Sequence, residues 1–117
     1  MIYRKAKEIK PIPIEHCMGG EGIVMMEKLL NAPYEMLGKG RAYVRHTLNS
    51  GVSIGMHTHE KEMETMVVVS GKATHIINGE IQHLEAGDII GAMSGDTHSI
   101  ACEGEEPLVV IAQVLYE

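Results

Sequence analysis

The chain has 117 residues, a formal net charge of −6, and no tryptophan or phenylalanine. This length suits one domain, so we interpret residues 1–117 as a single domain. The negative charge, the lack of a basic run and the scarcity of aromatics argue against nucleic acid as a partner. No apolar run approaches the roughly 20 residues of a membrane span, and the first residues lack the apolar stretch of a signal peptide. We therefore expect a cytoplasmic protein with no membrane partner.

Residues 1–40 are the least regular part of the sequence. Pro11, Pro13 and Pro33 mark irregular or edge segments, because proline cannot donate to a sheet ladder. Residues 21–31 place methionines and leucines near helical spacing, but glycines precede them where a better helix cap would stand. We favour a strand there and keep a helix as the alternative.

From residue 41 onwards, short strand patterns alternate with turn signals. The predicted strands are 41–48, 65–69, 73–77, 80–84, 89–90, 98–101 and 108–116. Asn78 and Gly79 tolerate positive φ, so they predict a hairpin between two of these strands. Further turns are predicted at residues 85–88 and 94–96. Closely spaced strands and turns of this kind predict an all-β sandwich or barrel.

Methionine is unusually common, with nine residues in the chain. It is flexible and fills irregular gaps, so we interpret six methionines as core filler in place of aromatics. They are Met25, Met26, Met56, Met63, Met66 and Met93. Met56 and Met66 flank the residues discussed next, and lining a pocket is their alternative role.

The pattern Gly51-x5-His57-x-His59-x4-Glu64-x6-Gly71, followed by His98, predicts a metal site. Residues i and i+2 of a strand share a face, so His57 and His59 can point toward one ion. Glu64 and His98 would complete the ligand set. Three imidazoles and one carboxylate suit Mn, Fe, Co, Ni or Zn better than Ca or Mg. Structural zinc sites are often rich in cysteine, which this set lacks, so we expect one divalent transition metal of the catalytic type.

Two other carboxylates, Glu60 and Glu62, lie in the same stretch as Glu64. We expect both in a solvated turn, whereas Glu64 leads directly into the apolar run 65–69.

The remaining histidines have no paired partner at ligand spacing, and we expect them on the surface or hydrogen-bonded in the core. They are His16, His46, His75 and His83. The strand of His46 leads into the metal motif, and Tyr43 and Arg45 occupy the opposite face of that strand. The alternation does not decide which face meets the pocket.

Residues 51–71 resemble the first motif of the cupin superfamily, G(x)5HxH(x)3,4E(x)6G, at every specified position. Residues 87–98 resemble the second motif, G(x)5PxG(x)2H(x)3N, with Met93 in place of proline and Cys102 in place of asparagine. The resemblance implies a single cupin-type antiparallel β-barrel, also called a jelly roll or double-stranded β-helix. Residues 41–117 would form the barrel core and residues 1–40 an N-terminal arm. The metal would lie inside the open end.

One carboxylate leaves a divalent ion with a net charge of about +1, so an anionic or oxygen-rich small molecule is the expected ligand. The resemblance allows a metalloenzyme of decarboxylase, dioxygenase, isomerase or lyase type. The alternative is a non-catalytic binding or sensor protein that uses the same metal. No residue outside the ligand set can be assigned a catalytic role from the sequence.

Two expectations concern thiols and assembly. Cys17 and Cys102 are expected to be free, because the chain shows no sign of export. The hydrophobic residues of the first 40 positions need burial, and strand edges invite pairing. We therefore expect a homodimer in which N-terminal strands cross to or pack against the partner, the alternative being a monomer whose residues 23–30 cover its own barrel.

Overall fold

The computed structural model describes residues 1–117 and consists of ten strands with three short 3-10 turns. The strands are β1 (Ile12–Glu15), β2 (Ile23–Lys28), β3 (Gly40–Leu48), β4 (Ser53–Thr58), β5 (Glu62–Ser70), β6 (Lys72–Ile77), β7 (Glu80–Glu85), β8 (Ile89–Ala92), β9 (Thr97–Cys102) and β10 (Leu108–Tyr116). The turns are η1 (Ala6–Glu8), η2 (Cys17–Gly19) and η3 (Tyr34–Met36). No helix combines the length and apolar character that crossing a membrane requires.

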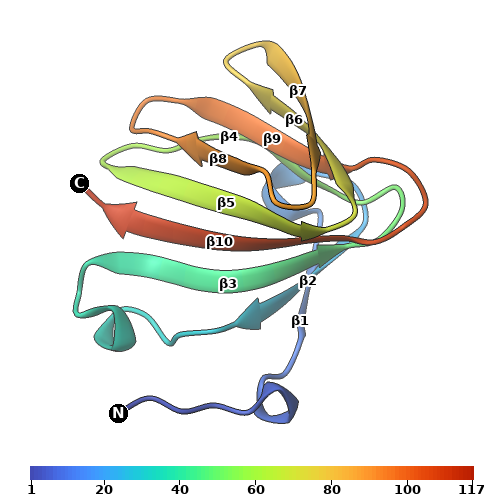
Figure 1. The fold of residues 1–117 in the computed structure, drawn as a ribbon. Helices are drawn as coiled ribbons and strands as arrows, with labels where there is room; N and C mark the ends of the chain where they lie inside the picture. The colour runs from blue at the N-terminus through green and yellow to red at the C-terminus, as the bar shows by residue number, and fades with distance from the viewer.

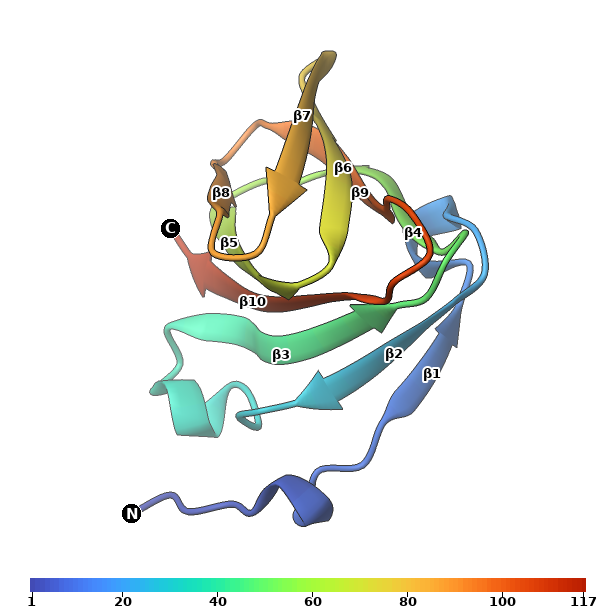
Figure 2. The same ribbon diagram turned by 45° about the vertical axis from the view of Figure 1, so that its right-hand side comes forward.

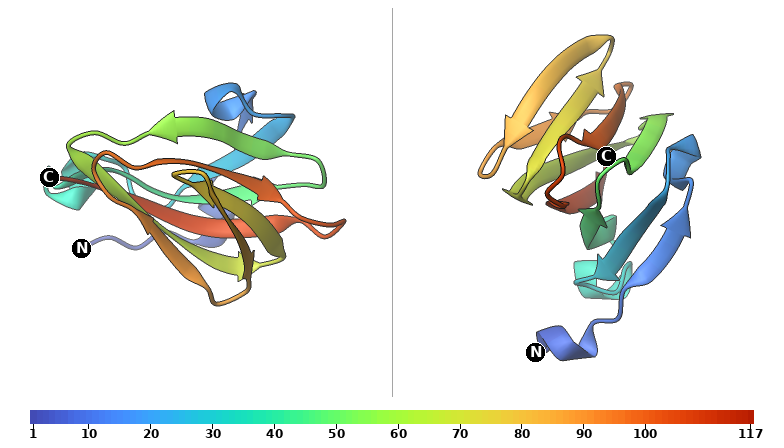
Figure 3. Two further views of the ribbon diagram at one scale, coloured as in Figure 1. Left: turned by 90° about the horizontal axis from the view of Figure 1, so that it is seen from above. Right: turned by 90° about the vertical axis from the view of Figure 1, so that its right-hand side faces the viewer.

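The strands form two antiparallel sheets, in the orders β1-β2-β3-β10-β5-β8 and β4-β9-β6-β7. The sheets curl toward each other around one interior (Figures 1 and 2). The β6–β7 hairpin lies at one end of the molecule and the N-terminal segment at the other (Figure 3). This all-β jelly-roll barrel is the fold that the sequence predicted.

Alternation along β10 shows how the core is built. Leu108, Val110, Ala112 and Val114 are buried, and the residues between them are only partly so. β10 lies in the middle of the larger sheet, between β3 and β5, so its inward side chains reach the centre of the core. A strand with period-two burial thus supplies one wall of the interior.

Several local predictions are confirmed. Residues 23–28 form strand β2, not a helix, and Asn78 and Gly79 join β6 to β7 with φ of 50° and 82°.

The interpretation of the methionines as core filler is correct for Met66, which is buried, and wrong for two others. Met56 and Met93 are 52% and 57% exposed, because each lies where its strand or turn faces solvent.

The N-terminal strands belong to the chain's own larger sheet. β2 pairs with β3, placing Met26 opposite His46, and β1 pairs with β2. Arg4 fastens the preceding segment by donating to the Leu29 carbonyl and pairing with Glu35, each at 2.8 Å. β1 therefore ends the larger sheet, and the predicted homodimer stays a prediction.

Candidate metal centre

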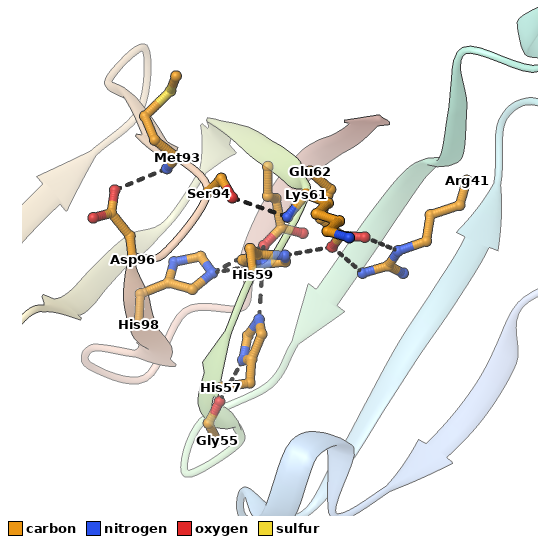
Figure 4. A network of polar contacts seen from close by, with 11 residues as sticks. Arg41, Gly55, His57, His59, Lys61, Glu62, Met93, Ser94, Asp96 and His98 are labelled. Atoms are coloured by element: carbon orange, nitrogen blue, oxygen red, sulfur yellow. Dashed lines mark hydrogen bonds and ion pairs between the residues drawn. The ribbon is translucent and has the colours of Figure 1, made fainter. Parts of the chain in front are cut away.

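The four predicted ligands come from four segments of the barrel. His57 lies on β4, His59 just after it, Glu64 on β5 and His98 on β9. The β4–β9 ladder places His57 directly opposite His98. One donor atom from each residue lies within 4.8 Å of the others, so the structure brings together a group that can hold a metal ion. Figure 4 shows the three imidazoles converging.

The spacing of these atoms fits a ligand shell. His59 Nε2 lies 3.1 Å from His98 Nε2, and Glu64 Oε1 lies 3.2 and 3.0 Å from those two nitrogens. Neighbouring ligands of an octahedral ion with bonds of about 2.1 Å are separated by about 3.0 Å. His57 Nε2 is farther from Glu64 Oε1, at 3.9 Å. The donor types suit a first-row divalent ion, and three of the separations are close to the edge length of an octahedral shell.

Glu64 carries the negative charge of the cluster in a buried position. Burial alone would raise its pKa, but the neighbouring His57 and His98 outweigh burial and hold the pKa well below its ordinary value. The same contact with Glu64 raises the pKa of His57. The carboxylate is therefore ionised and ready to bind a cation.

Hydrogen bonds outside the cluster orient two of the imidazoles. His57 Nδ1 donates to the Gly55 carbonyl at 2.8 Å, and His59 Nδ1 donates to Glu62 at 2.6 Å (Figure 4). When the ring is neutral and its proton is on Nδ1, the lone pair of Nε2 is free for a metal at the centre. These contacts select the tautomer that a metal ligand needs.

His98 is oriented by a second chain of contacts. Gln82 Oε1 can only accept, so His75 Nδ1 donates to it at 2.9 Å. Burial lowers the pKa of His75 and keeps the ring neutral, so its Nε2 accepts from His98 Nδ1 at 2.8 Å. His98 Nε2 is left with its lone pair toward the centre. His75 is hydrogen-bonded in the core, as expected, but its contact with a candidate ligand was not foreseen.

Glu62 corrects one of our expectations. It is the first residue of β5 and only 14% of its side chain is exposed, so it does not lie in a solvated turn. Arg41 binds both carboxylate oxygens, at 2.8 and 2.6 Å, and lowers the pKa of Glu62 to about 2, with help from His59. Glu60 is exposed, as expected. The short spacing between His59 and Glu62 was the only sequence signal that the two residues interact. Spacing alone does not tell whether a carboxylate binds the metal itself or binds the far nitrogen of a histidine ligand.

A short turn positions the loop that carries His59. The Met93 N–H donates to Asp96 at 2.8 Å, a bond that the proline of the family motif could not make. The Asp96 carbonyl in turn accepts from the His59 N–H at 3.1 Å, and the Ser94 hydroxyl accepts from the Lys61 N–H at 2.9 Å. Met93 in place of the motif proline therefore does not open the turn, because its N–H adds a hydrogen bond within it.

A cavity of about 180 Å³ opens beside the cluster. Its walls include three of the candidate ligands and a mostly apolar lining: Ile14, Cys17, Met18, Met26, Arg41, Ala42, Val44, His46, Ile54, His57, His59, Glu64, Met66 and Val114. The even-numbered residues Ala42, Val44 and His46 of β3 thus meet the cavity, together with Arg41 near the start of the strand, which answers the question that the sequence left open. Gly55, which has no side chain, allows η2 to lie against β4 and bring Cys17 and Met18 to the wall.

Three polar side chains line the cavity without belonging to the cluster. Arg41 is engaged by Glu62. Both cysteines are free, as expected, and burial raises the pKa of Cys17, so its thiol stays protonated. Burial lowers the pKa of His46, so its imidazole is neutral. Beside the candidate ligands, Arg41 and His46 are the lining groups that could contact a bound molecule through charge or a strong hydrogen bond.

Comparison with known proteins agrees with this geometry. The cupin domain family matches residues 44–114. An oxalate-binding protein of Thermotoga maritima is 34% identical over 111 residues, which cover 95% of this chain and 91% of that protein. The crystal structure of a predicted oxalate decarboxylase from Thermotoga maritima superposes on this chain with a TM-score of 0.95. The two sequences are 33% identical, and the match covers 99% of this chain and 100% of that chain.

A more distant cupin-like protein from Thermotoga maritima is 18% identical and shares the fold, with a TM-score of 0.71 over 83% of this chain and 71% of that chain. The motifs, the barrel and the matched family agree, and the chain belongs to the cupin superfamily.

Proposed function

We propose that His57, His59, Glu64 and His98 bind one divalent transition metal, and that this ion holds a small oxygen-rich anion of the oxalate class. The observation that carries this proposal is the convergence of three imidazole nitrogens and one carboxylate oxygen beside a small cavity. Four protein ligands on a six-coordinate ion leave two coordination positions for a chelating anion.

Charge and surroundings favour an anion over a neutral molecule. A divalent ion with one carboxylate keeps a net charge of about +1, and the mostly apolar walls strengthen its attraction for a negative ligand. The cavity is small, which fits a molecule of few carbon atoms. The relative named for oxalate binding supports the same class of ligand.

Calorimetric titration of oxalate tests the proposal. We expect saturable binding to protein loaded with Mn²⁺, and none to metal-free protein or to a His98→Ala variant exposed to the same metal. Oxalate binding of equal strength to metal-free protein would contradict the proposal.

A metalloenzyme acting on the same kind of anion is the second candidate, of decarboxylase, dioxygenase, isomerase or lyase type. The neutral imidazole of His46 in the cavity favours it, because this group is free of the metal cluster and can hydrogen-bond to a reacting molecule. Assays of metal-loaded protein for oxalate consumption, carbon dioxide release and oxygen uptake distinguish turnover from binding. Binding without any of the three supports a carrier or sensor.

We also propose that the chain forms a homodimer through its N-terminal strands. β1 ends the larger sheet, so one of its edges pairs with no strand of this chain. Ile12 and Ile23, on β1 and β2, are 40% and 42% exposed. An unpaired edge beside exposed apolar side chains favours pairing with a second copy.

A further inference from the structure

His46 is an isolated polar group in an apolar wall. It is 92% buried on β3, where its neighbours on the same face are Val44 and Leu48. The residues paired with it across the sheet, Met26 and Val110, are apolar as well. An apolar side chain would fit these surroundings without the cost of burying an imidazole.

The imidazole has no partner within the chain. His46 Nδ1 is the only buried side-chain nitrogen or oxygen without a hydrogen bond. The ring makes no bond through Nε2 either, and that atom is not fully buried, so it meets the cavity that His46 lines. A buried N–H without an acceptor is costlier than an unused lone pair, which places the proton of the neutral ring on Nε2. His46 therefore presents an N–H donor to the cavity.

Two simpler roles do not account for this arrangement. His46 is not part of the group whose donor atoms lie within 4.8 Å, so it is not a fifth ligand of that cluster. Packing does not require it, because it leaves a nitrogen unpaired in an otherwise apolar region. The donor is instead available to a molecule that occupies the cavity.

We propose that His46 donates a hydrogen bond to the end of the bound anion that faces away from the metal, and thereby selects anions with an oxygen at that end. The inference rests on the proposed function and adds a specificity-determining residue to the same site. Apart from the metal cluster, His46 and the Cys17 thiol, the one polar side chain of the lining is Arg41, which Glu62 engages. A metal at the cluster and a donor at His46 suit a short anion with oxygens at both ends.

Oxalate and acetohydroxamate are suitable probes, because both offer two oxygens on adjacent atoms to a metal. They differ at the end that faces away from the metal, where oxalate has two oxygens and acetohydroxamate has a methyl group and an N–H. We would titrate each into Mn²⁺-loaded wild-type protein and into His46→Leu, which keeps a similar volume without a donor. Loss of a hydrogen bond to a charged acceptor predicts that oxalate affinity falls about tenfold or more, whereas acetohydroxamate affinity changes less than about threefold.

Two controls separate recognition from structure. His46→Leu should bind Mn²⁺ like the wild type and be at least as stable in the metal-free form, because it removes an unpaired buried nitrogen. His46→Gln, which restores an N–H donor, should recover part of the oxalate affinity.

The outcomes separate this inference from the function on which it rests. A selective loss of oxalate affinity in His46→Leu supports it. Unchanged binding, an equal loss for both probes, or loss of Mn²⁺ overturns the role of His46 while leaving metal-dependent oxalate binding by the wild type intact. If Mn²⁺-loaded wild-type protein does not bind oxalate, the proposed function falls and this inference falls with it.

Discussion

His59 uses its two nitrogens for different purposes. Nδ1 is fixed by Glu62, and Nε2 lies 3.2 Å from Glu64 Oε1 and 3.1 Å from His98 Nε2. A ring fixed in this way does not have to be ordered when a metal arrives, so less conformational entropy is lost on binding. The same reasoning applies to His98, which His75 fixes.

The ligand assignment predicts which histidines control metal content. Removing a ligand should reduce affinity more than the roughly 10- to 100-fold loss that follows loss of an outer partner. We therefore expect His98→Ala to lose bound metal, whereas His83→Ala, whose side chain is 69% exposed, keeps it. Elemental analysis of the purified variants measures this, and equal metal in both would refute the assignment. His75→Ala is not a neutral control, because His75 orients His98.

Metal binding should weaken as the pH falls. Imidazoles must be neutral to bind a metal, and contact with Glu64 raises the pKa of His57 in the metal-free protein. Protons therefore compete at a higher pH than for an ordinary histidine, and Zn²⁺ affinity should decrease steadily from about pH 8 to about pH 6. Competition with a chromogenic chelator across this range measures the change. An affinity independent of pH would argue against histidine ligands.

Glu62 should matter for metal affinity although it is not a candidate ligand. Glu62→Gln weakens the contacts with both Arg41 and His59, and we expect Zn²⁺ affinity to fall by about tenfold. Glu60→Gln is the matched control, since Glu60 is exposed and makes no side-chain hydrogen bond. Chelator competition on the two variants provides the measurement; equal affinities would show that Glu62 does not orient His59.

Glu62 should also affect stability in a defined pH range. Its pKa is lowered from 4.5 to about 2, so its stabilising contribution is present above pH 4.5 and is lost as the pH falls toward 2. The difference in unfolding free energy between wild type and Glu62→Gln should shrink in that window.

At the scale of elements, Gly71 joins β5 to β6 under two constraints. Its φ is +80°, and a Cβ there would contact the Pro107 carbonyl oxygen. Gly51 has a φ of +82° with nothing within 4 Å, so it carries only the first constraint. Gly51→Ala should cost about 1 kcal/mol and Gly71→Ala at least about 2 kcal/mol, because only the latter forces backbone to move. Urea unfolding measures both, and equal costs would show that the contact does not matter.

Patterns within one segment were predictable from the sequence. Alternation predicted most of the strands, Asn78-Gly79 predicted its hairpin, and the i, i+2 spacing predicted that His57 and His59 act together. Each of these depends on local chain geometry.

Features that depend on pairing between strands were not predictable. The contact of His75 with His98 requires the β6–β9 register, and the inward face of β3 depends on how β3 pairs with β10. Neither register can be predicted from the residues of one strand alone, because register depends on two paired strands. The different surroundings of Glu62 and Glu60 were not predictable either. Glu62 is held by Arg41, which lies on β3 in a distant part of the sequence.

At the scale of the whole molecule, the proposed dimer has a simple test. Light scattering at micromolar concentration should give about twice the 12.8 kDa of one chain. Ile12→Lys should shift the mass toward the monomer by placing a charge beside the β1 edge. Ile81→Lys, at a 63% exposed position on β7, should not. A wild-type mass near 12.8 kDa would refute the dimer.

The central claim is that one metal, held by four protein residues, binds a small anion in the cavity. Anomalous diffraction from crystals grown with Mn²⁺ and oxalate tests it most directly. We predict a single strong peak about 2.0 to 2.3 Å from Nε2 of His57, His59 and His98 and from a Glu64 oxygen, with oxalate oxygens completing the coordination. No peak among these residues, or a metal bound there without oxalate at saturating concentration, would contradict the account.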